Sequence, residues 1–247
     1  MRWIAALGGG AFVLVSLVIG ARLLRLALRT RRIPEASLGA GLFLMGGLAY
    51  PLTSVARQAQ ALSDETRTGL MIAAHVLMVV GIAAIGLFTQ RVFRPESQRA
   101  RAGLLLLGAA LLGCFVWQGL SPGFRAGALA KEGLAIVVIN ALAAVAMGWT
   151  ALESIHYASL LKRRLALGLA DPEVARKVRQ WGLASGAATA ITLWTLLLHA
   201  RGLDPAASAA GALVIGPLGL VAALGLARAF RHGEGHPSPR GRSRPLG

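Results

Sequence analysis

The stretch LMIAAHVLMVVGIAAIGLFTQ, residues 70–90, decides the fold class of this chain. It contains no Asp, Glu, Lys or Arg, and His75 is its one ionisable side chain of the kind that titrates near neutral pH. A helix rises 1.5 Å per residue, so about 20 apolar residues cross the roughly 30 Å hydrocarbon core of a bilayer. The run is continuous and shows no alternation of polar and apolar residues, which favours a helix over a barrel strand. The stretch therefore predicts a transmembrane helix.

Six further apolar blocks of similar length lie on either side of this one. They cover residues 3–28, 36–55, 102–120, 134–161, 181–200 and 206–230. The block 36–55 is the weakest, because several glycines and Pro51 dilute its apolar content. The composition agrees, since a soluble chain with 55% hydrophobic and 15% charged residues could not shield so much apolar surface from water. We therefore expect an all-α polytopic transmembrane bundle of seven helices over residues 1–230.

The net charge of +16 arises from basic residues that alternate from loop to loop. Twenty of the 26 Lys and Arg residues lie in the last turns of the first and seventh blocks, in the connections after the first, third and fifth blocks, or in the C-terminal tail. Loops rich in Lys and Arg stay in the cytoplasm. The pattern predicts an N-terminus outside and a C-terminus in the cytoplasm, and it indicates a topology signal rather than a nucleic-acid binder.

The first block has a second interpretation as a cleaved signal peptide. Arg2 would form its basic region, residues 11–19 its apolar region and Ala21 the small residue at the cleavage site. Cleavage would leave six helices. A signal peptide enters with its basic end inside, whereas here the stronger basic cluster follows the apolar block, so a retained helix is favoured.

Two connections carry the signals of helix starts. Pro34 and Glu35 suit the first turn of the second helix, and Asp171-Pro172-Glu173 supplies an N-cap, a first-turn proline and an acid beside the helix dipole. The stretches RTRRIPEASLG, residues 29–39, and LALGLADP, residues 165–172, resemble segments of uncharacterised bacterial seven-helix membrane proteins. This resemblance implies no activity. Together with the Arg-, Ala- and Gly-rich composition, it points to a bacterial inner (plasma) membrane.

Ionisable residues inside a membrane helix are costly and indicate candidate sites. Glu153, His156 and Tyr157 are spaced i, i+3 and i+4 in the fifth block, so they share one helical stripe near its cytoplasmic end. Asn140 is the deeper polar residue of the same block. One interpretation is a cytoplasm-facing polar pocket in which Glu153 sets the charge or tautomer of His156. The other is an interfacial cluster with Tyr157 in the aromatic belt.

Two histidines form a second candidate site in the outer half of the membrane. His75 lies in the third block and His199 at the end of the sixth. They are a candidate pair of ligands for a metal or haem, or else an interhelical hydrogen-bond donor and a hydrated side chain. Because Cys114 is the single cysteine, the chain can form neither an internal disulfide nor a two-cysteine metal motif. We predict no resident metal or cofactor.

Other polar and small residues have expected structural roles. Trp181 and the Trp117-Gln118 pair are expected at the membrane interfaces. Close helix packing is expected at the glycines of the fourth, sixth and seventh blocks, with a kink at Gly216-Pro217. The tail 231–247 has the basic, polar composition of a disordered cytoplasmic segment, and the glycines and proline around His232, Glu234 and His236 argue against a zinc-binding helix there.

Chemical requirements exclude some functions of seven-helix proteins. A retinal protein needs a lysine in its last helix, but Lys131, Lys162 and Lys177 all lie in connections. Metallohydrolases need several His and Asp ligands that converge from different helices. A receptor-like, sensory or scaffold protein is therefore the first hypothesis, with anionic lipid headgroups and a cytoplasmic protein as partners of the basic loops. The alternative is a small-solute transporter that uses the polar stripe of the fifth helix. An enzyme with catalytic residues is the least favoured class.

Overall fold

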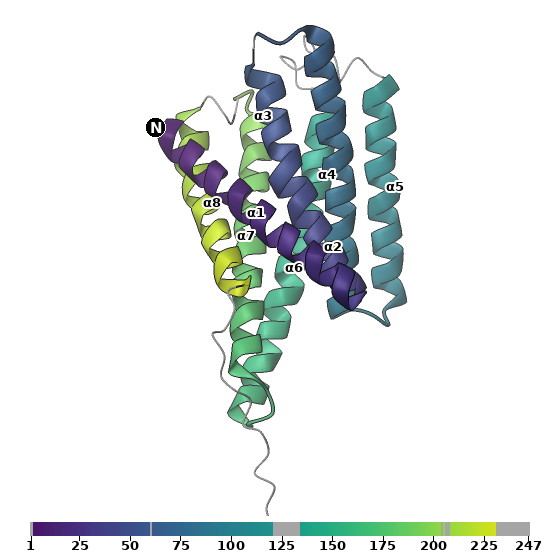
Figure 1. Ribbon diagram of the computed structural model, residues 1–247, viewed down its shortest axis with the longest axis vertical. Coiled ribbons are helices and arrows are strands. Elements are labelled where there is room, and N and C mark those ends of the chain that lie inside the picture. Colours follow the sequence, from purple (N-terminus) through teal and green to yellow (C-terminus); the bar gives the residue numbers. More distant parts are fainter. Residues whose placement is uncertain (1, 60, 121–133, 204, 206–207, 231–247) are drawn as a thin grey trace, which may run out of the picture.

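The computed structural model describes residues 2–59, 61–120, 134–203, 205 and 208–230. The described residues are almost entirely helical (Figure 1). The elements are α1 (Arg2–Thr30), α2 (Ile33–Gly41), η1 (Leu42–Ala49), α3 (Tyr50–Gln58), α4 (Asp64–Phe93), α5 (Gln98–Leu120), α6 (Leu134–Ala166), α7 (Pro172–Ala200) and α8 (Ala209–Phe230). Seven helical segments are long and apolar enough to cross a membrane. The prediction of an all-α bundle with seven membrane spans is confirmed.

The second span is built from three consecutive elements rather than one regular helix. α2, η1 and α3 follow one another without a break, and they contain a candidate membrane span of 25 residues, Ile33–Arg57. The middle element, η1, is a π-helix that ends directly before Tyr50 and Pro51. Proline has no amide hydrogen to donate to the preceding turn, so the hydrogen-bond pattern must change near this position. The segment that looked weakest in sequence therefore has the length of a full membrane span.

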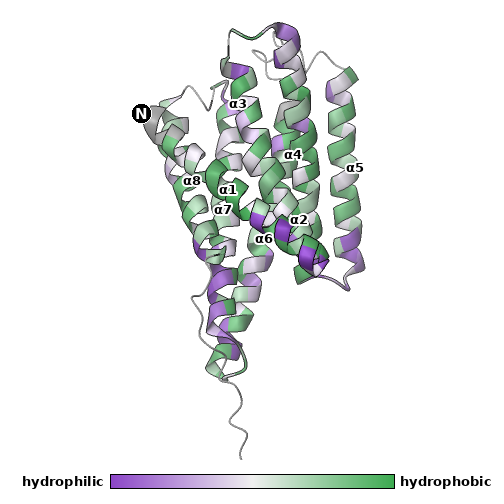
Figure 2. Ribbon diagram, in the orientation of Figure 1, coloured by the Kyte–Doolittle hydropathy of each residue, from purple (hydrophilic) through white to green (hydrophobic). Residues whose placement is uncertain are grey.

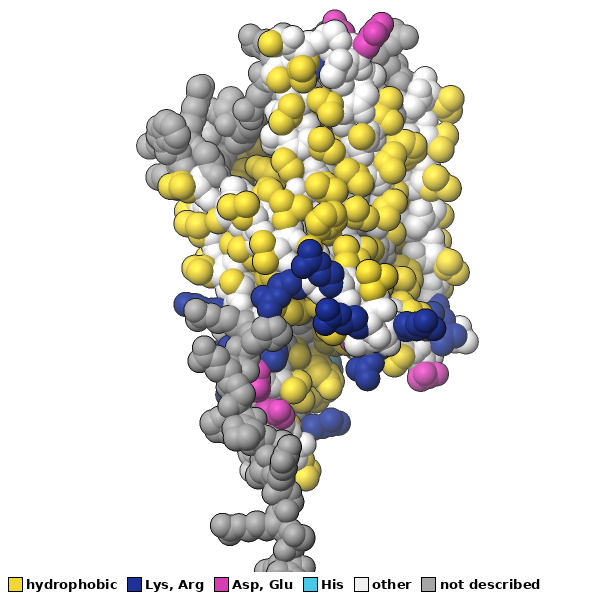
Figure 3. Space-filling view, in the orientation of Figure 1, with side chains coloured by type: hydrophobic (Ala, Val, Ile, Leu, Met, Phe, Trp, Pro, Cys, Tyr) yellow, Lys and Arg dark blue, Asp and Glu magenta, His cyan; other side chains and the backbone are white. Residues whose placement is uncertain are grey.

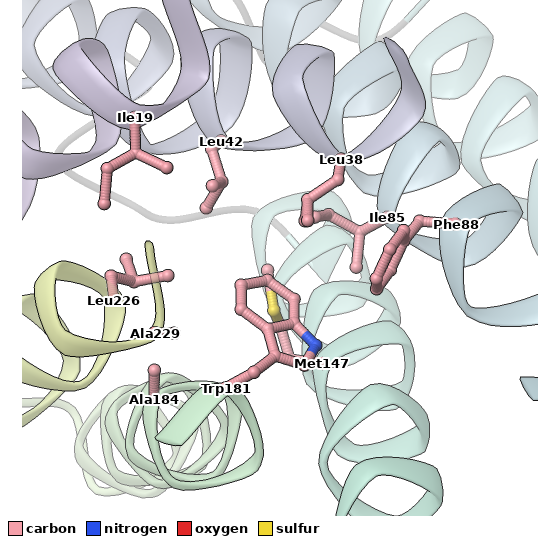
Figure 4. Close-up of a cluster of buried hydrophobic side chains, with 10 residues drawn as sticks. All are labelled: Ile19, Leu38, Leu42, Ile85, Phe88, Met147, Trp181, Ala184, Leu226 and Ala229. Carbon is pink, nitrogen blue, oxygen red and sulfur yellow. The ribbon is translucent and has the colours of Figure 1, made fainter. Parts of the chain in front are cut away.

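Six of the seven spans form a closed ring. α1 packs against α8, α8 against α7, α7 against α6, α6 against α4, α4 against the α2–η1 segment, and that segment against α1. Side chains from every span of the ring fill its interior (Figure 4). They are Ile19, Leu38, Leu42, Ile85, Phe88, Met147, Trp181, Ala184, Leu226 and Ala229. The first and last helices of the chain are thus neighbours, and the ring has a packed hydrophobic core.

Helix α5 lies outside this ring, against α4 and α6. A single stripe on α5, formed by Leu107, Leu111 and Cys114, packs against Ile82 of α4 and Ile139 of α6. Apart from Gln118, which is also buried, the other residues of α5 are half-buried or exposed, as expected for a helix that faces lipid on one side. The glycines of α5 do not serve close packing, because a Cβ at Gly103, Gly108 or Gly113 would meet no described atom within 4 Å. The prediction that these three glycines bring helices together is wrong.

Close approach occurs instead where α1 crosses its two neighbours. A Cβ on Gly8 would collide with the backbone of Gly216 in α8, and a Cβ on Gly219 would lie 3.0 Å from the Gly8 oxygen. Gly20 of α1 and Gly39 of α2 face each other in the same way, with a Cβ on Gly20 3.0 Å from the Gly39 oxygen. Small residues let helix backbones touch, and van der Waals contact drives helix association in lipid. These glycines therefore close the ring on both sides of α1.

One end of the bundle collects nearly all described basic residues, and we call it the basic end. It is the end where α1, α4, α6 and α8 finish and where α2, α5 and α7 begin. Hydrophilic residues, coloured purple in Figure 2, are concentrated at this end, and so are the Lys and Arg side chains, coloured dark blue in Figure 3. At the opposite end the basic residues whose side chains the structure describes are Arg57, Arg67 and Arg201. The bundle therefore has a strong charge asymmetry along its long axis.

The α6–α7 hairpin, residues 155–180, extends beyond the other helices at the basic end (Figure 1). α6 has 33 residues and α7 has 29, against 22 in α8 and 23 in α5. The predicted helix start is confirmed, because α7 begins at Pro172 and the Asp171 side chain accepts a hydrogen bond from the Glu173 backbone N–H at 2.7 Å. α7 therefore begins about two helical turns before the apolar block that was recognised in the sequence.

Candidate functional site

An ion pair joins α4 to α6 at the basic end. Arg94, the residue that follows α4, donates from its Nε to both carboxylate oxygens of Glu153, at 2.9 and 3.1 Å. The Glu153 side chain is 15% exposed and that of Arg94 is 50% exposed. Glu153 can be recognised in the sequence as a candidate site residue, but Arg94 cannot be recognised as its partner, because the two are 59 positions apart. This ion pair holds the C-terminal end of α4 beside Glu153 of α6.

An aromatic cluster surrounds this level and connects four helices. Phe88 of α4 packs edge-on against Trp181 of α7, with ring centroids 5.7 Å apart. Trp181 packs in turn against Phe230, the last residue of α8, at 6.2 Å. Phe93 contacts both Phe88, at 6.1 Å, and Tyr157 of α6, at 5.8 Å. Such edge-to-face pairs add to the energy of burial, so the cluster ties α4, α6, α7 and α8 together at the basic end.

A buried polar contact lies one helical turn deeper. The hydroxyl oxygens of Thr89 on α4 and Thr150 on α6 are 2.6 Å apart, and both side chains are fully buried. Each hydroxyl is also within 3.0 Å of a carbonyl oxygen of its own helix. A hydroxyl has a single hydrogen, so one threonine donates across the interface while the other donates to its own helix. The two buried threonine hydroxyls thereby satisfy each other and need no ligand.

The four residues of the predicted polar pocket do not lie together. Glu153 and Tyr157 both face the end of α4, through the ion pair and the Phe93 contact. His156 is exposed, and its backbone oxygen accepts a hydrogen bond from the Ser159 hydroxyl at 2.6 Å. Asn140 lies 13 residues before Glu153 in the same helix, which separates them by about 20 Å. A role for His156 next to Glu153 stays a prediction.

The two histidines of the outer candidate site lie on helices that each contact α6. His75 is buried in α4, where its Nδ1 is 2.8 Å from the Met71 oxygen. His199 is the penultimate residue of α7, and its Nδ1 is 2.7 Å from the Thr195 oxygen. Each ring is thus oriented by its own helix. Within the described residues, no group of three or more His, Cys, Asp or Glu side chains could hold a metal ion.

The structure corrects the expected roles of two residues near the membrane interfaces. Trp181 was expected as an interface anchor, but it is only 6% exposed and lies in the ring core. Gln118 was expected to be an interface residue beside Trp117, but it is 1% exposed, whereas Trp117 is 44% exposed. The residues that precede Trp181 are charged, which made the start of α7 look like the membrane boundary. For Trp181 the reason is the α6–α7 hairpin. The charged residues before Trp181 belong to the projecting part of α7, whereas Trp181 itself packs against other helices.

Comparison with protein-family models, with curated proteins and with solved structures finds no match. The functional interpretation therefore depends on the geometry of this chain alone. The C-terminal segment with His232, Glu234 and His236 lies outside the described residues.

The ion pair gives a prediction for stability. Arg94→Glu places two carboxylates against each other, so we expect the free energy of unfolding in lipid to fall by about 1 kcal/mol. The value is modest because Arg94 is half exposed. The exchanged pair Arg94→Glu/Glu153→Arg should recover at least half of the loss, as measured in a double-mutant cycle.

A matched control for this cycle is the pair Arg67 and Asp64, which are 3.5 Å apart with Asp64 86% exposed. Asp64→Asn should change the free energy of unfolding by less than about 0.5 kcal/mol. If the exchanged variant at positions 94 and 153 is no more stable than either single variant, the pair does not join α4 to α6.

Proposed function

We propose that the chain is a receptor-like or scaffold membrane protein that contacts cytoplasmic partners through its basic end. We place it in the plasma membrane of a bacterium, because the charge asymmetry follows the positive-inside rule and the composition is Arg-, Ala- and Gly-rich. The observation that carries the proposal is the α6–α7 hairpin, which extends from the basic end away from the membrane spans. A helical extension of this kind offers a surface to a soluble partner.

Packing at the basic end also supports this function over transport. The ring core at this end is filled by large side chains, of which Ile85 and Leu226 are at most 2% exposed. Glu153, the carboxylate on which a coupled transporter would depend, is held by Arg94. A transporter binds its solute near the bilayer midplane, where polar groups line a cavity. The closed core and the engaged carboxylate are the features expected of a rigid bundle that presents a surface.

Basic residues nearer the spans have a second expected partner in anionic lipid. Arg25 and Arg29 of α1 and Arg99 of α5 lie close to the level at which the shorter helices end. Basic side chains near an anionic membrane surface each contribute about 1 kcal/mol of attraction. We expect these residues to hold the bundle at its depth in the membrane, while the hairpin reaches past the headgroups.

Thiol accessibility tests the proposal against transport. In a Cys114→Ala background, single cysteines are placed at Met147 and at Leu226 in the ring core, and at Leu167 in the hairpin. A water-soluble maleimide should modify the Leu167→Cys variant within minutes, because Leu167 is 72% exposed. The two core positions should stay unmodified from both sides of the membrane, in the presence or absence of solutes. Modification of a core cysteine that depends on an added solute would favour the transporter instead.

A further inference from the structure

The tip of the α6–α7 hairpin lies well beyond the ends of α4 and α8 at the basic end. α6 continues for 13 residues from Glu153, which is paired at the end of α4, to its last residue, Ala166, and this adds about 20 Å. α7 begins nine residues before Trp181, which contacts the last residue of α8, so it extends about 14 Å past that helix. A headgroup layer is only about 5–8 Å thick on each side of the hydrocarbon. The tip is therefore in water.

Two exposed leucines lie at this tip. Leu167 is 72% exposed and Leu169 is 73% exposed. Two hydrogen bonds order the turn. The Leu169 N–H donates to the Arg164 oxygen at 2.9 Å, and the Gly168 N–H donates to the Leu165 oxygen at 3.0 Å. Gly168 has the left-handed φ of +69° that this turn requires. These bonds form a Schellman cap, in which an apolar residue after the glycine commonly packs back onto the helix. Leu169 is instead largely exposed, so it leaves an apolar surface at the tip.

Positive charge surrounds these leucines. The hairpin has six basic residues, Lys162, Arg163, Arg164, Arg176, Lys177 and Arg179, and two acidic ones. Both acids are engaged within α7, since Asp171 caps the helix and Glu173 pairs with Lys177 at 2.7 Å. Arg163 and Arg164, which come four and three residues before Leu167, are exposed. An apolar tip with a basic rim is complementary to an apolar groove with an acidic rim.

We propose that the tip of the α6–α7 hairpin binds an acidic cytoplasmic protein, with Leu167 and Leu169 in an apolar groove and the exposed arginines paired with carboxylates. This inference rests on the proposed function and names the partner class and its contact site. A second copy of the chain does not suit the site, because two basic hairpins repel each other. The headgroups of the chain's own membrane are more than one Debye length from the tip, since that length is about 8 Å at physiological ionic strength.

Photocross-linking in the cells that express the full chain identifies the partner. A photoreactive amino acid is placed at Leu167 or Leu169 in the tip, at Leu28 elsewhere on the basic end, and at Leu105 on the lipid-facing side of α5. Leu28 and Leu105 are 81% and 74% exposed, which matches the tip residues. We expect both tip positions, and not Leu105, to capture the same polypeptide, which mass spectrometry identifies.

Binding of that purified polypeptide to the chain in phosphatidylcholine nanodiscs then tests the chemistry. We expect Kd to rise at least tenfold for Arg163→Glu/Arg164→Glu and for Leu167→Ser/Leu169→Ser, and to rise steeply with salt. Arg32→Glu/Arg91→Glu is the matched control, because it reverses two exposed charges at the basic end outside the hairpin, and it should leave Kd unchanged. Equal thermal midpoints of all variants show that the fold is intact.

Several outcomes would overturn the inference. They are cross-links from the tip only to lipid or to a second copy of the chain, tip-dependent binding to protein-free vesicles of anionic lipid, and a Kd insensitive to both hairpin variants. Capture of a partner at Leu28 but not at the tip would overturn this contact site and leave the proposed function standing. Capture of no protein at any position of the basic end would contradict both proposals.

Discussion

Trp181→Ala is expected to lower the free energy of unfolding in lipid by about 3 kcal/mol, the largest loss among single truncations in the ring core. Trp181 is 6% exposed and contacts Phe88 and Phe230, so its removal leaves a cavity where α4, α7 and α8 meet. Its Nε1 has no hydrogen-bond partner among the described residues. Trp181→Phe should therefore retain most of the stability, because it keeps an aromatic ring and loses no hydrogen bond.

The control for this prediction is Trp117→Ala, which truncates a tryptophan that is 44% exposed on α5. We expect that variant to lose less than about 1 kcal/mol, since a partly exposed side chain leaves no closed cavity. Reversible unfolding of the chain in bicelles measures both values. Equal losses for the two tryptophans would show that Trp181 is an interface anchor after all.

Gly8→Leu is expected to separate α1 from α8 and to destabilise the bundle by about 3 kcal/mol. Even the first carbon of the new side chain would collide with the backbone of Gly216, which cannot move aside like a flexible side chain. The readout is a disulfide between cysteines introduced across the α1–α8 contact in a Cys114→Ala background. Its yield under mild oxidation should fall at least tenfold in the Gly8→Leu variant.

Gly10→Leu is the matched control on the same helix. A Cβ at Gly10 would meet no described atom within 4 Å, so the side chain would project into lipid. We expect the disulfide yield and the stability of this variant to equal those of the parent chain. Loss of the cross-link in both variants would mean that position 8 has no special contact and that the ring is not closed between α1 and α8.

The membrane spans could be predicted from the sequence because they depend on local properties. The length of an apolar block decides whether a helix can cross, and residues 70–90 and the other six blocks met that requirement. The start of α7 was also local, since Asp171, Pro172 and Glu173 act within one helical turn. The sidedness of the bundle remains a prediction from its charges.

The packing of the spans could not be predicted, because it depends on residues far apart in the chain. Arg94 and Glu153 both appeared as ordinary interfacial charges until the structure brought them together. The α1–α8 contact joins Gly8 to Gly216, and nothing near either glycine in the sequence indicates the other. Leucine is equally favourable against lipid and inside the bundle, because lipid tails are as apolar as its side chain. The hydropathy of a span therefore does not show which of its faces packs against other helices.

Trp181 shows that a tryptophan beside basic residues can lie either at a membrane interface or inside a helical bundle. Tryptophan next to basic residues is typical of a membrane interface. Here the basic residues belong to the part of α7 that precedes its contacts with α4 and α8, and Trp181 itself is packed inside the bundle. The start of α7 at Pro172 was predicted correctly. The error was to expect Trp181, which opens the apolar block, on an exposed surface at the membrane boundary, whereas it packs between helices.

The central claim is that the basic end of a seven-span bundle faces the cytoplasm, with the α6–α7 hairpin exposed there. Asp64→Cys and Leu169→Cys, each in a Cys114→Ala background, place one thiol at each end of the bundle. A membrane-impermeant maleimide is applied to intact cells and to inside-out vesicles. We expect Asp64→Cys to be labelled in intact cells and Leu169→Cys only in inside-out vesicles. Labelling of Leu169→Cys in intact cells would contradict the account.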